Sequence, residues 1–161
     1  MHILTLGNEI LRKKAEKVEK IDVDLVKTAQ QMLNLIHVGK GIGLAGPQIG
    51  LLKRIFVVHI EGDIPRIFIN PSIIETSVET TKFEEGCLSL PSVWGTIIRS
   101  KEVRVQAWNE RGKPFTIDAE GILARVILHE NDHLDGKLFI DHLSELKRNR
   151  IIAKYEKRKK A

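Results

Sequence analysis

The sequence predicts an α+β fold in which antiparallel β-sheets surround a central helix, with a further helix at the C-terminus. Several Val-, Ile- and Phe-rich segments are separated by short turn sequences, a pattern typical of antiparallel hairpins. Two longer segments repeat apolar residues every three or four positions, which indicates amphipathic helices. At 161 residues, with 42% hydrophobic and 29% charged residues, the chain is expected to form one globular domain over residues 1–161.

Charge and cysteine content narrow the classes of protein that fit. The net charge is +5, but residues 147–161 hold eight basic residues and one acid, so the rest of the chain is close to neutral. The single cysteine, Cys87, excludes an internal disulfide framework and fits a reducing compartment. The sequence shows neither a secretory signal nor an apolar stretch long enough to cross a membrane. We therefore expect a cytoplasmic protein without a membrane partner.

The first fifty residues are predicted to form a loop, a helix and a glycine-rich loop. Residues 7–12 read as a loop with a short turn. Asp22 is a suitable N-cap for an amphipathic helix, which Gly39 and Gly41 are predicted to end. The buried face of this helix is expected to hold Val26, Ala29, Leu33 and Ile36. The four glycines of residues 41–50 allow a close backbone approach to another group, or positive φ.

Strands are predicted through the middle of the chain. Residues 54–60 and 66–69 are rich in Val, Ile and Phe and are separated by a turn, so they read as a hairpin or as neighbouring strands. Residues 73–81 are a weaker strand candidate. Pro91 predicts that the chain leaves any central sheet at that point, because proline cannot donate to the ladder.

The C-terminal half is predicted to contain two more strands and two helices. Residues 102–108 alternate apolar and polar side chains, which indicates a half-buried strand. A turn leads to a short strand around residues 115–117. A helix then runs from about Asp118 to Leu134, and the last helix begins near Ser144, so that residues 144–161 form a basic C-terminal helix.

The central helix carries the sequence His129-Glu130-Asn131-Asp132-His133. Positions four apart share one face of a helix, so both imidazoles can bind the same metal ion. Glu130 directly follows the first ligand, where its carboxylate can reach a water held by that metal. Steps of four and three back along the helix place two apolar side chains beside the metal, those of Val126 and Ile122.

Cys87 is a candidate for the third metal ligand. A thiolate with two imidazoles leaves one coordination position open, which is typical of a catalytic metal. Attack on an amide carbonyl creates an oxyanion, which requires fixed hydrogen-bond donors. The candidates are the side-chain amide of Gln48 and the backbone N–H of Leu88. An ion pair of Glu85 with Arg99 is expected to order the cysteine segment.

Two other classes of protein compete with this interpretation. The first is a zincin-type metalloprotease, although Phe139 stands where the metzincin pattern asks for a third histidine. Asp141, His142 and Glu145 lie downstream as other candidate third ligands, and Glu145 fits a different zincin class. The second is a protein that binds only nucleic acid through its basic tail. We reject it as the main function because it leaves the metal-binding pattern unexplained.

Three segments together resemble the signature motifs of peptide deformylases. They are Gly41-Ile42-Gly43-Leu44-Ala45-Gly46-Pro47-Gln48, Glu85-Gly86-Cys87-Leu88-Ser89 and His129-Glu130-Asn131-Asp132-His133, in the order and at a spacing similar to those of the family. The match covers essentially the whole chain and looks more like the shorter bacterial type. Gly46 and Leu128 differ from commoner forms, but neither is a proposed ligand or catalytic group.

The resemblance implies a reaction and a metal. The reaction is removal of the formyl group from the N-terminal formyl-methionine of newly made polypeptides, with release of formate. The implied cofactor is one divalent metal per chain, usually Fe²⁺, with zinc, nickel or cobalt as substitutes. Its ligands would be Cys87, His129 and His133. The same likeness supports contact of the basic C-terminal helix with ribosomal RNA, which a charge of +7 permits.

The resemblance also assigns roles around the metal. Glu130 becomes the general acid and base, and Gln48 with the Leu88 amide becomes the oxyanion pair. Backbone groups of the substrate-binding residues Ile42, Gly43 and Gly86 would hold the peptide in an extended conformation. The methionine side chain would be enclosed by Ile42, Ile122, Val126 and the ring of His129.

Overall fold

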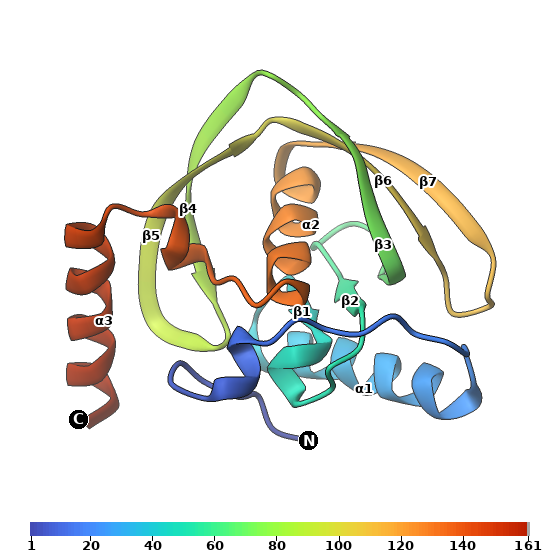
Figure 1. The fold of residues 1–161 in the computed structure, drawn as a ribbon, viewed down its shortest axis with the longest axis horizontal. Helices are drawn as coiled ribbons and strands as arrows, with labels where there is room; N and C mark the ends of the chain where they lie inside the picture. The colour runs from blue at the N-terminus through green and yellow to red at the C-terminus, as the bar shows by residue number, and fades with distance from the viewer. Residues whose placement is uncertain (161) are drawn as a thin grey trace.

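The structure is a computed structural model that describes residues 1–160 (Figure 1). Within these residues an antiparallel five-stranded sheet has the order β1-β2-β3-β6-β7, and β4 pairs with β5 as a separate two-stranded ribbon. The strands are β1 (Gly43–Ala45), β2 (Ile55–Val58), β3 (Arg66–Thr76), β4 (Thr80–Cys87), β5 (Leu90–Ser100), β6 (Glu102–Trp108) and β7 (Pro114–Glu120). The helices are α1 (Val23–Gly39), α2 (Gly121–Leu134) and α3 (Glu145–Lys160), with short 3₁₀ helices η1 (Glu9–Arg12), η2 (Gly46–Ile49) and η3 (Phe139–His142).

Helix α2 lies between the two sheets, as Figure 1 shows, and it contacts strands of both. Ala124 and Ile127 of α2 belong to the same buried cluster as Phe56 of β2 and Phe68 of β3. The two phenylalanine rings stack with their centroids 4.7 Å apart. Burying an aromatic side chain of this kind contributes about 1.5–3 kcal/mol to folding. The predicted α+β class, with antiparallel sheets around a central helix, is confirmed.

Helix α1 begins and ends where the sequence predicted. Asp22 is its N-cap, and Oδ1 accepts a hydrogen bond from the Leu25 amide at 2.9 Å. Its last residue is Gly39, and the residue in the left-handed conformation is the C-cap Lys40, with φ +57°, rather than either glycine. A Cβ at Gly39 or Gly41 would instead lie 3.0 Å from the side chain of Leu88. These glycines make room for the residue that follows Cys87.

Strand β3 corrects the prediction of two separate strands in this region. It runs without a break through Pro71, where its register against β6 shifts between Ile69 and Ser72. Asn70 has φ +49°, and its side chain bonds both the amide and the carbonyl of Val18, at 2.8 and 2.9 Å. A proline is tolerated at such an irregularity because no ladder hydrogen bond is required of it.

Two further boundaries differ from the prediction. Strand β5 begins at Leu90, next to Pro91, and the sequence did not predict it. Within residues 1–160 it pairs only with β4, and β4 already lies outside the larger sheet, so the prediction that the chain leaves a central sheet at Pro91 is wrong: it leaves after Thr76, and Pro91 lies within the ribbon. The central helix starts at Gly121 rather than near Asp118, because residues 118–120 remain paired with β6. The side chain of Asp118 binds Arg104 across that ladder at 2.7 Å.

Helix α3 begins one residue after Ser144, whose hydroxyl accepts a hydrogen bond from the Lys147 amide at 3.3 Å. It packs against β5, with Tyr155 buried at the contact. Figure 1 shows it at the edge of the molecule, away from α1. Within residues 1–160, none of the helices is both long and apolar enough to span a membrane.

Candidate metal centre

Helix α2 carries His129 and His133 one turn apart on its buried face. Both side chains are almost completely buried, and their ring centroids lie 5.2 Å apart. This arrangement follows from the helical repeat, because residues four apart project from the same side.

Cys87 completes the donor set from the end of β4. Its Sγ lies 3.4 Å from Nε2 of His133, and the ligand atoms of Cys87, His129 and His133 all lie within 4.8 Å of one another. Among residues 1–160 this is the one such group of three. The downstream alternatives do not join it, and Nε2 of His142 instead lies 2.8 Å from a carboxylate oxygen of Asp132.

The three donors fit a divalent transition metal. One sulfur and two imidazole nitrogens are the ligands that zinc, iron, nickel and cobalt accept, and three protein ligands leave a position open. Burial lowers the pKa of His133 well below its usual value, which keeps this imidazole in the neutral form that a ligand requires. The site therefore has the chemistry of a catalytic metal centre.

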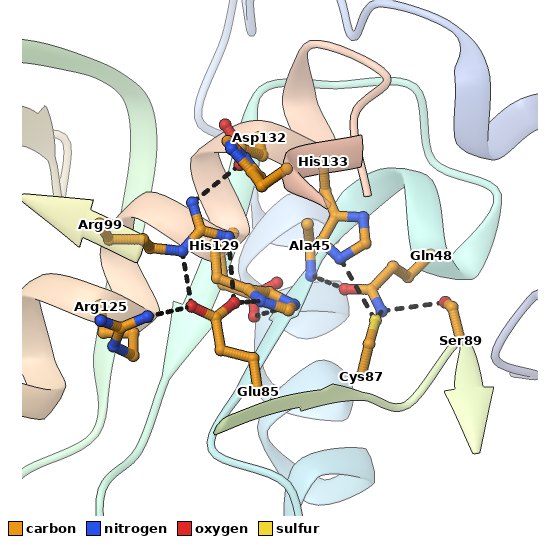
Figure 2. Close-up of polar contacts among 12 residues, drawn as sticks. Ala45, Gln48, Glu85, Cys87, Ser89, Arg99, Arg125, His129, Asp132 and His133 are labelled. Atoms are coloured by element: carbon orange, nitrogen blue, oxygen red, sulfur yellow. Dashed lines mark hydrogen bonds and ion pairs between the residues drawn. The ribbon is translucent and has the colours of Figure 1, made fainter. Parts of the chain in front are cut away.

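Glu85 holds the first histidine in place. Its Oε1 lies 2.8 Å from Nδ1 of His129, which leaves Nε2 for the metal (Figure 2). Arg99 makes a bidentate pair with this carboxylate at 2.7 and 3.0 Å, confirming the expected ion pair. Arg125 adds a third contact at 2.6 Å. Burial would raise the pKa of Glu85, but hydrogen bonds from His129 and Arg99 outweigh it and hold that pKa well below its usual value.

This network was largely missed from the sequence. Of its contacts, only the Glu85–Arg99 ion pair was expected. The contact of Glu85 with His129 was not expected, although a carboxylate commonly supports a metal-binding histidine. Asp132 accepts a hydrogen bond from Nη1 of Arg99 at 2.9 Å and so joins the network that Figure 2 shows. Local sequence patterns could not reveal these contacts, because the residues come from the three separate elements β4, β5 and α2.

Glu130 faces the cavity beside the metal-binding group. Its Oε2 lies 3.9 Å from Nε2 of His129, and its Oε1 has no hydrogen-bond partner among the described residues. A Cβ at Gly43 would lie 2.6 Å from Oε2, so the backbone of β1 passes directly over this carboxylate. Burial raises the pKa of Glu130 to about 7. A carboxyl group poised near neutral pH can both accept and donate a proton.

Gln48 lies next to the thiol. Its Nε2 donates to Oγ of Ser89 at 3.0 Å and lies 3.5 Å from Sγ of Cys87. Its Oε1 accepts a hydrogen bond from the amide of Ala45 at 2.9 Å, so the residue also caps its own loop. Figure 2 shows the side-chain amide of Gln48 between Ala45 and the sulfur atom of Cys87.

A cavity of about 420 Å³ opens onto this group. Cys87, His129 and Glu130 line it, together with the predicted oxyanion residue Leu88. Gln48 and His133 lie outside its wall. All five residues predicted to bind substrate lie on the wall: Ile42, Gly43, Gly86, Ile122 and Val126. The fold therefore brings the three predicted motifs to one place.

Comparison with known proteins agrees with this geometry. The family model described as polypeptide deformylase matches residues 1–149. A peptide deformylase of Clostridium botulinum is 49% identical over 144 residues, covering 89% of this chain and 97% of the relative. One from Borreliella burgdorferi is 43% identical, covering 96% of this chain and 94% of the relative.

Solved structures give the same result. A peptide deformylase from Legionella pneumophila superposes with a TM-score of 0.94 at 41% identity, covering 98% of this chain and 94% of that one. One from Ehrlichia chaffeensis in complex with actinonin has a TM-score of 0.94 at 37% identity, covering 100% and 98%. These likenesses do not favour the zincin alternative. The chain belongs to the polypeptide deformylase family of metal-dependent hydrolases, as its three motifs indicated.

Proposed function

We propose that this chain removes the formyl group from the N-terminal formyl-methionine of nascent polypeptides and releases formate. The observation that carries the proposal is the convergence of Cys87, His129 and His133, with Cys87, His129 and Glu130 on the wall of one partly apolar cavity. A hydrolase for a small amide needs an acidified water, a proton carrier and donors for an oxyanion. The chain offers a candidate for each part.

We propose Fe²⁺ as the resident metal, one per chain, with zinc, nickel or cobalt as substitutes. A thiolate with two imidazoles binds all of these ions, so the donor set supports the class of metal, and family likeness supports iron. When bound, the metal supplies Lewis acidity and brings the pKa of water close to 7.

Glu130 acts as the general acid and base in this proposal. Its carboxylate takes a proton from the attacking water and passes one to the nitrogen of the departing peptide. The Leu88 amide and the Gln48 side chain would donate hydrogen bonds to the developing oxyanion. The position of Gln48 next to Sγ of Cys87 supports a role close to the reacting group.

The substrate would lie extended between two free strand edges. Among residues 1–160, strand β1 pairs only with β2 and β4 only with β5, so each keeps an edge available for a further strand. These edges carry the backbone groups of Gly43 and Gly86, and Ile42 adjoins them. The methionine side chain would be enclosed by Ile122, Val126 and the ring of His129. Ile122 is 47% exposed, so covering its surface favours binding.

The test is formate release from a formyl-Met peptide by Fe²⁺-loaded enzyme under anaerobic conditions. Glu130→Ala should lower kcat by about 10²–10⁴-fold, the usual contribution of a general acid or base, while the metal is retained. Glu120→Ala, which removes an exposed acid at the start of the same helix, is the matched control. Cleavage of internal peptide bonds without formate release would contradict the proposal and favour a zincin-type protease.

We further propose that the enzyme acts in the cytoplasm, close to the ribosome. A single thiol suits a reducing compartment. The last turn of α3 contains Lys157, Arg158, Lys159 and Lys160, all exposed. Such a basic end can bind the phosphates of ribosomal RNA, and family likeness supports this partner.

A further inference from the structure

Arg125 connects α2 to both strands of the β4–β5 ribbon. It lies one helical turn before His129, lines the cavity and is only 7% exposed. Its Nη1 donates to Oε2 of Glu85 at 2.6 Å and to the carbonyl of Ile97 at 3.0 Å. Its Nη2 donates to the carbonyl and the hydroxyl of Thr81, at 2.8 and 3.1 Å. Figure 2 shows the guanidinium pointing at the Glu85 carboxylate.

These contacts leave little of the guanidinium for a ligand. Both terminal nitrogens already bond protein oxygens, and the side chain also lies against the ring of Phe83, with the guanidinium carbon 5.8 Å from its centroid. A positive charge in the wall of a peptide-binding cavity invites the interpretation that it binds a substrate carboxylate. The four hydrogen bonds of its terminal nitrogens to protein oxygens argue instead that Arg125 acts on the protein itself.

The ribbon needs such a connection. In the part of the chain that the structure describes, strands β4 and β5 form sheet pairings only with each other, so side chains must hold the ribbon against α2. Thr81 lies at the N-terminal end of β4, and Gly86 and Cys87 lie at its C-terminal end. Because Arg125 contacts Thr81 and Glu85 together, it fixes most of the length of β4 relative to the helix that supplies the two histidines.

We propose that Arg125 is a positioning residue that sets the metal-binding geometry through Glu85. The carboxylate accepts from Arg125 on Oε2 and faces Nδ1 of His129 with Oε1, so this guanidinium, together with the bidentate Arg99, fixes the group that holds the imidazole. The same contacts hold the strand that supplies the third donor. The inference rests on the proposed function in one respect, that the three donors bind a metal ion.

The test is the rate at which excess chelator removes Ni²⁺ from the loaded enzyme. Arg125→Met should release the metal about tenfold or more faster, as expected for loss of a partner behind a ligand. Arg125→Lys should be intermediate, because one nitrogen cannot reach Glu85, Ile97 and Thr81 together. Arg104→Met is the matched control, because this arginine also joins strands through carboxylates but is exposed and outside the cavity.

Hydrogen exchange of the β4 amides gives a second readout that does not depend on catalysis. Exchange across residues 80–87 should accelerate in Arg125→Met and not in Arg104→Met. Wild-type metal release together with wild-type exchange in Arg125→Met would overturn the proposal. If that variant does not fold, Arg125→Lys and Thr81→Val provide the comparison, and wild-type release rates in both would also overturn it.

A double-mutant cycle separates action through Glu85 from a general loss of packing. If Arg125 acts through this carboxylate, Arg125→Met should add little to the release rate of Glu85→Gln. Full additivity of the two effects would contradict the proposed route. Failure of the proposed function would appear separately, as absent formate release from a wild-type enzyme that holds its metal.

Discussion

The carboxylate of Glu130 fills the space that a side chain at position 43 would occupy. A Cβ on Gly43 would lie 2.6 Å from Oε2 of Glu130 and 2.9 Å from its Cγ and Cδ. The absence of a side chain in β1 therefore allows the proposed proton carrier to sit under the free strand edge. This relationship gives the first prediction.

Gly43→Ala should lower kcat by about 100-fold, because a displacement of about 1 Å at a reacting group can cost that much. Metal content should stay at the wild-type level, since Gly43 does not belong to the donor group. Formate release and metal stoichiometry measure the two effects. Gly41→Ala is the comparison: its Cβ would meet the flexible side chain of Leu88 at 3.0 Å rather than the Glu130 carboxylate, so its loss of kcat should be smaller. A wild-type kcat in Gly43→Ala would show that Glu130 can move without consequence.

Replacing Gln48 separates its two contacts. Gln48→Leu removes both the donor near Cys87 and the acceptor that caps Ala45, whereas Gln48→Glu keeps the acceptor and loses the donor. If the donor stabilises an oxyanion, both variants should lose about 10²–10³-fold in kcat. Steady-state formate release measures this loss. Near-normal activity in Gln48→Glu alone would assign Gln48 to loop capping only.

Metal removal should abolish activity and lower thermal stability. A ligand that binds only the folded state stabilises it by about 4 kcal/mol at a thousand times its Kd. Stripping the metal should therefore lower Tm, and adding it back should restore Tm and activity. Cys87→Ala should fold but gain no Tm from added metal.

His142→Ala is the control for the metal experiment. This histidine was a candidate third ligand in the zincin interpretation, but it bonds Asp132 and stands apart from the donor group. Differential scanning fluorimetry with and without Ni²⁺ should show normal metal stabilisation in this variant. Loss of that stabilisation in His142→Ala, but not in Cys87→Ala, would reverse the ligand assignment.

Truncation of the basic end of α3 tests the ribosomal partner. Removal of residues 157–161 takes away four basic side chains but keeps Tyr155, which is buried against the body of the protein. Ribosome affinity should fall, and the slope of log K against log salt should become shallower by about one for each RNA phosphate that is no longer neutralised.

A matched control for the truncation removes the same charge elsewhere. Lys13, Lys14, Lys17 and Lys20 are exposed near the N-terminus, and their replacement by alanine should leave the salt slope unchanged. Formate release from a short peptide should be normal in both variants. Equal loss of ribosome affinity in the two would indicate a nonspecific effect of net charge.

Local sequence patterns predicted the parts of this protein that depend on neighbouring residues. Asp22 caps α1 because its side chain reaches an amide only three residues away. His129 and His133 share a face because the helical repeat places residues four apart on one side. The alternation of residues 102–108 predicted β6 with its buried Val103, Val105 and Ala107. The three motifs, taken in order, indicated the family without any knowledge of tertiary contacts.

The arrangement of distant segments was decided by the tertiary structure. The sequence could suggest that Cys87 joins the histidines, but only the ribbon that runs from Thr80 to Ser100 brings its sulfur to them. Strand β5 was not predicted, because it contains Pro91. Residues 118–120 remain in a strand rather than in the helix because they pair with β6. The link between Glu85 and His129 spans 44 positions. Such a contact depends on strand register and helix packing rather than on local spacing. The sequence motifs therefore identified the candidate metal donors Cys87, His129 and His133, whereas only the tertiary structure showed how Glu85, Arg99 and Arg125 support them.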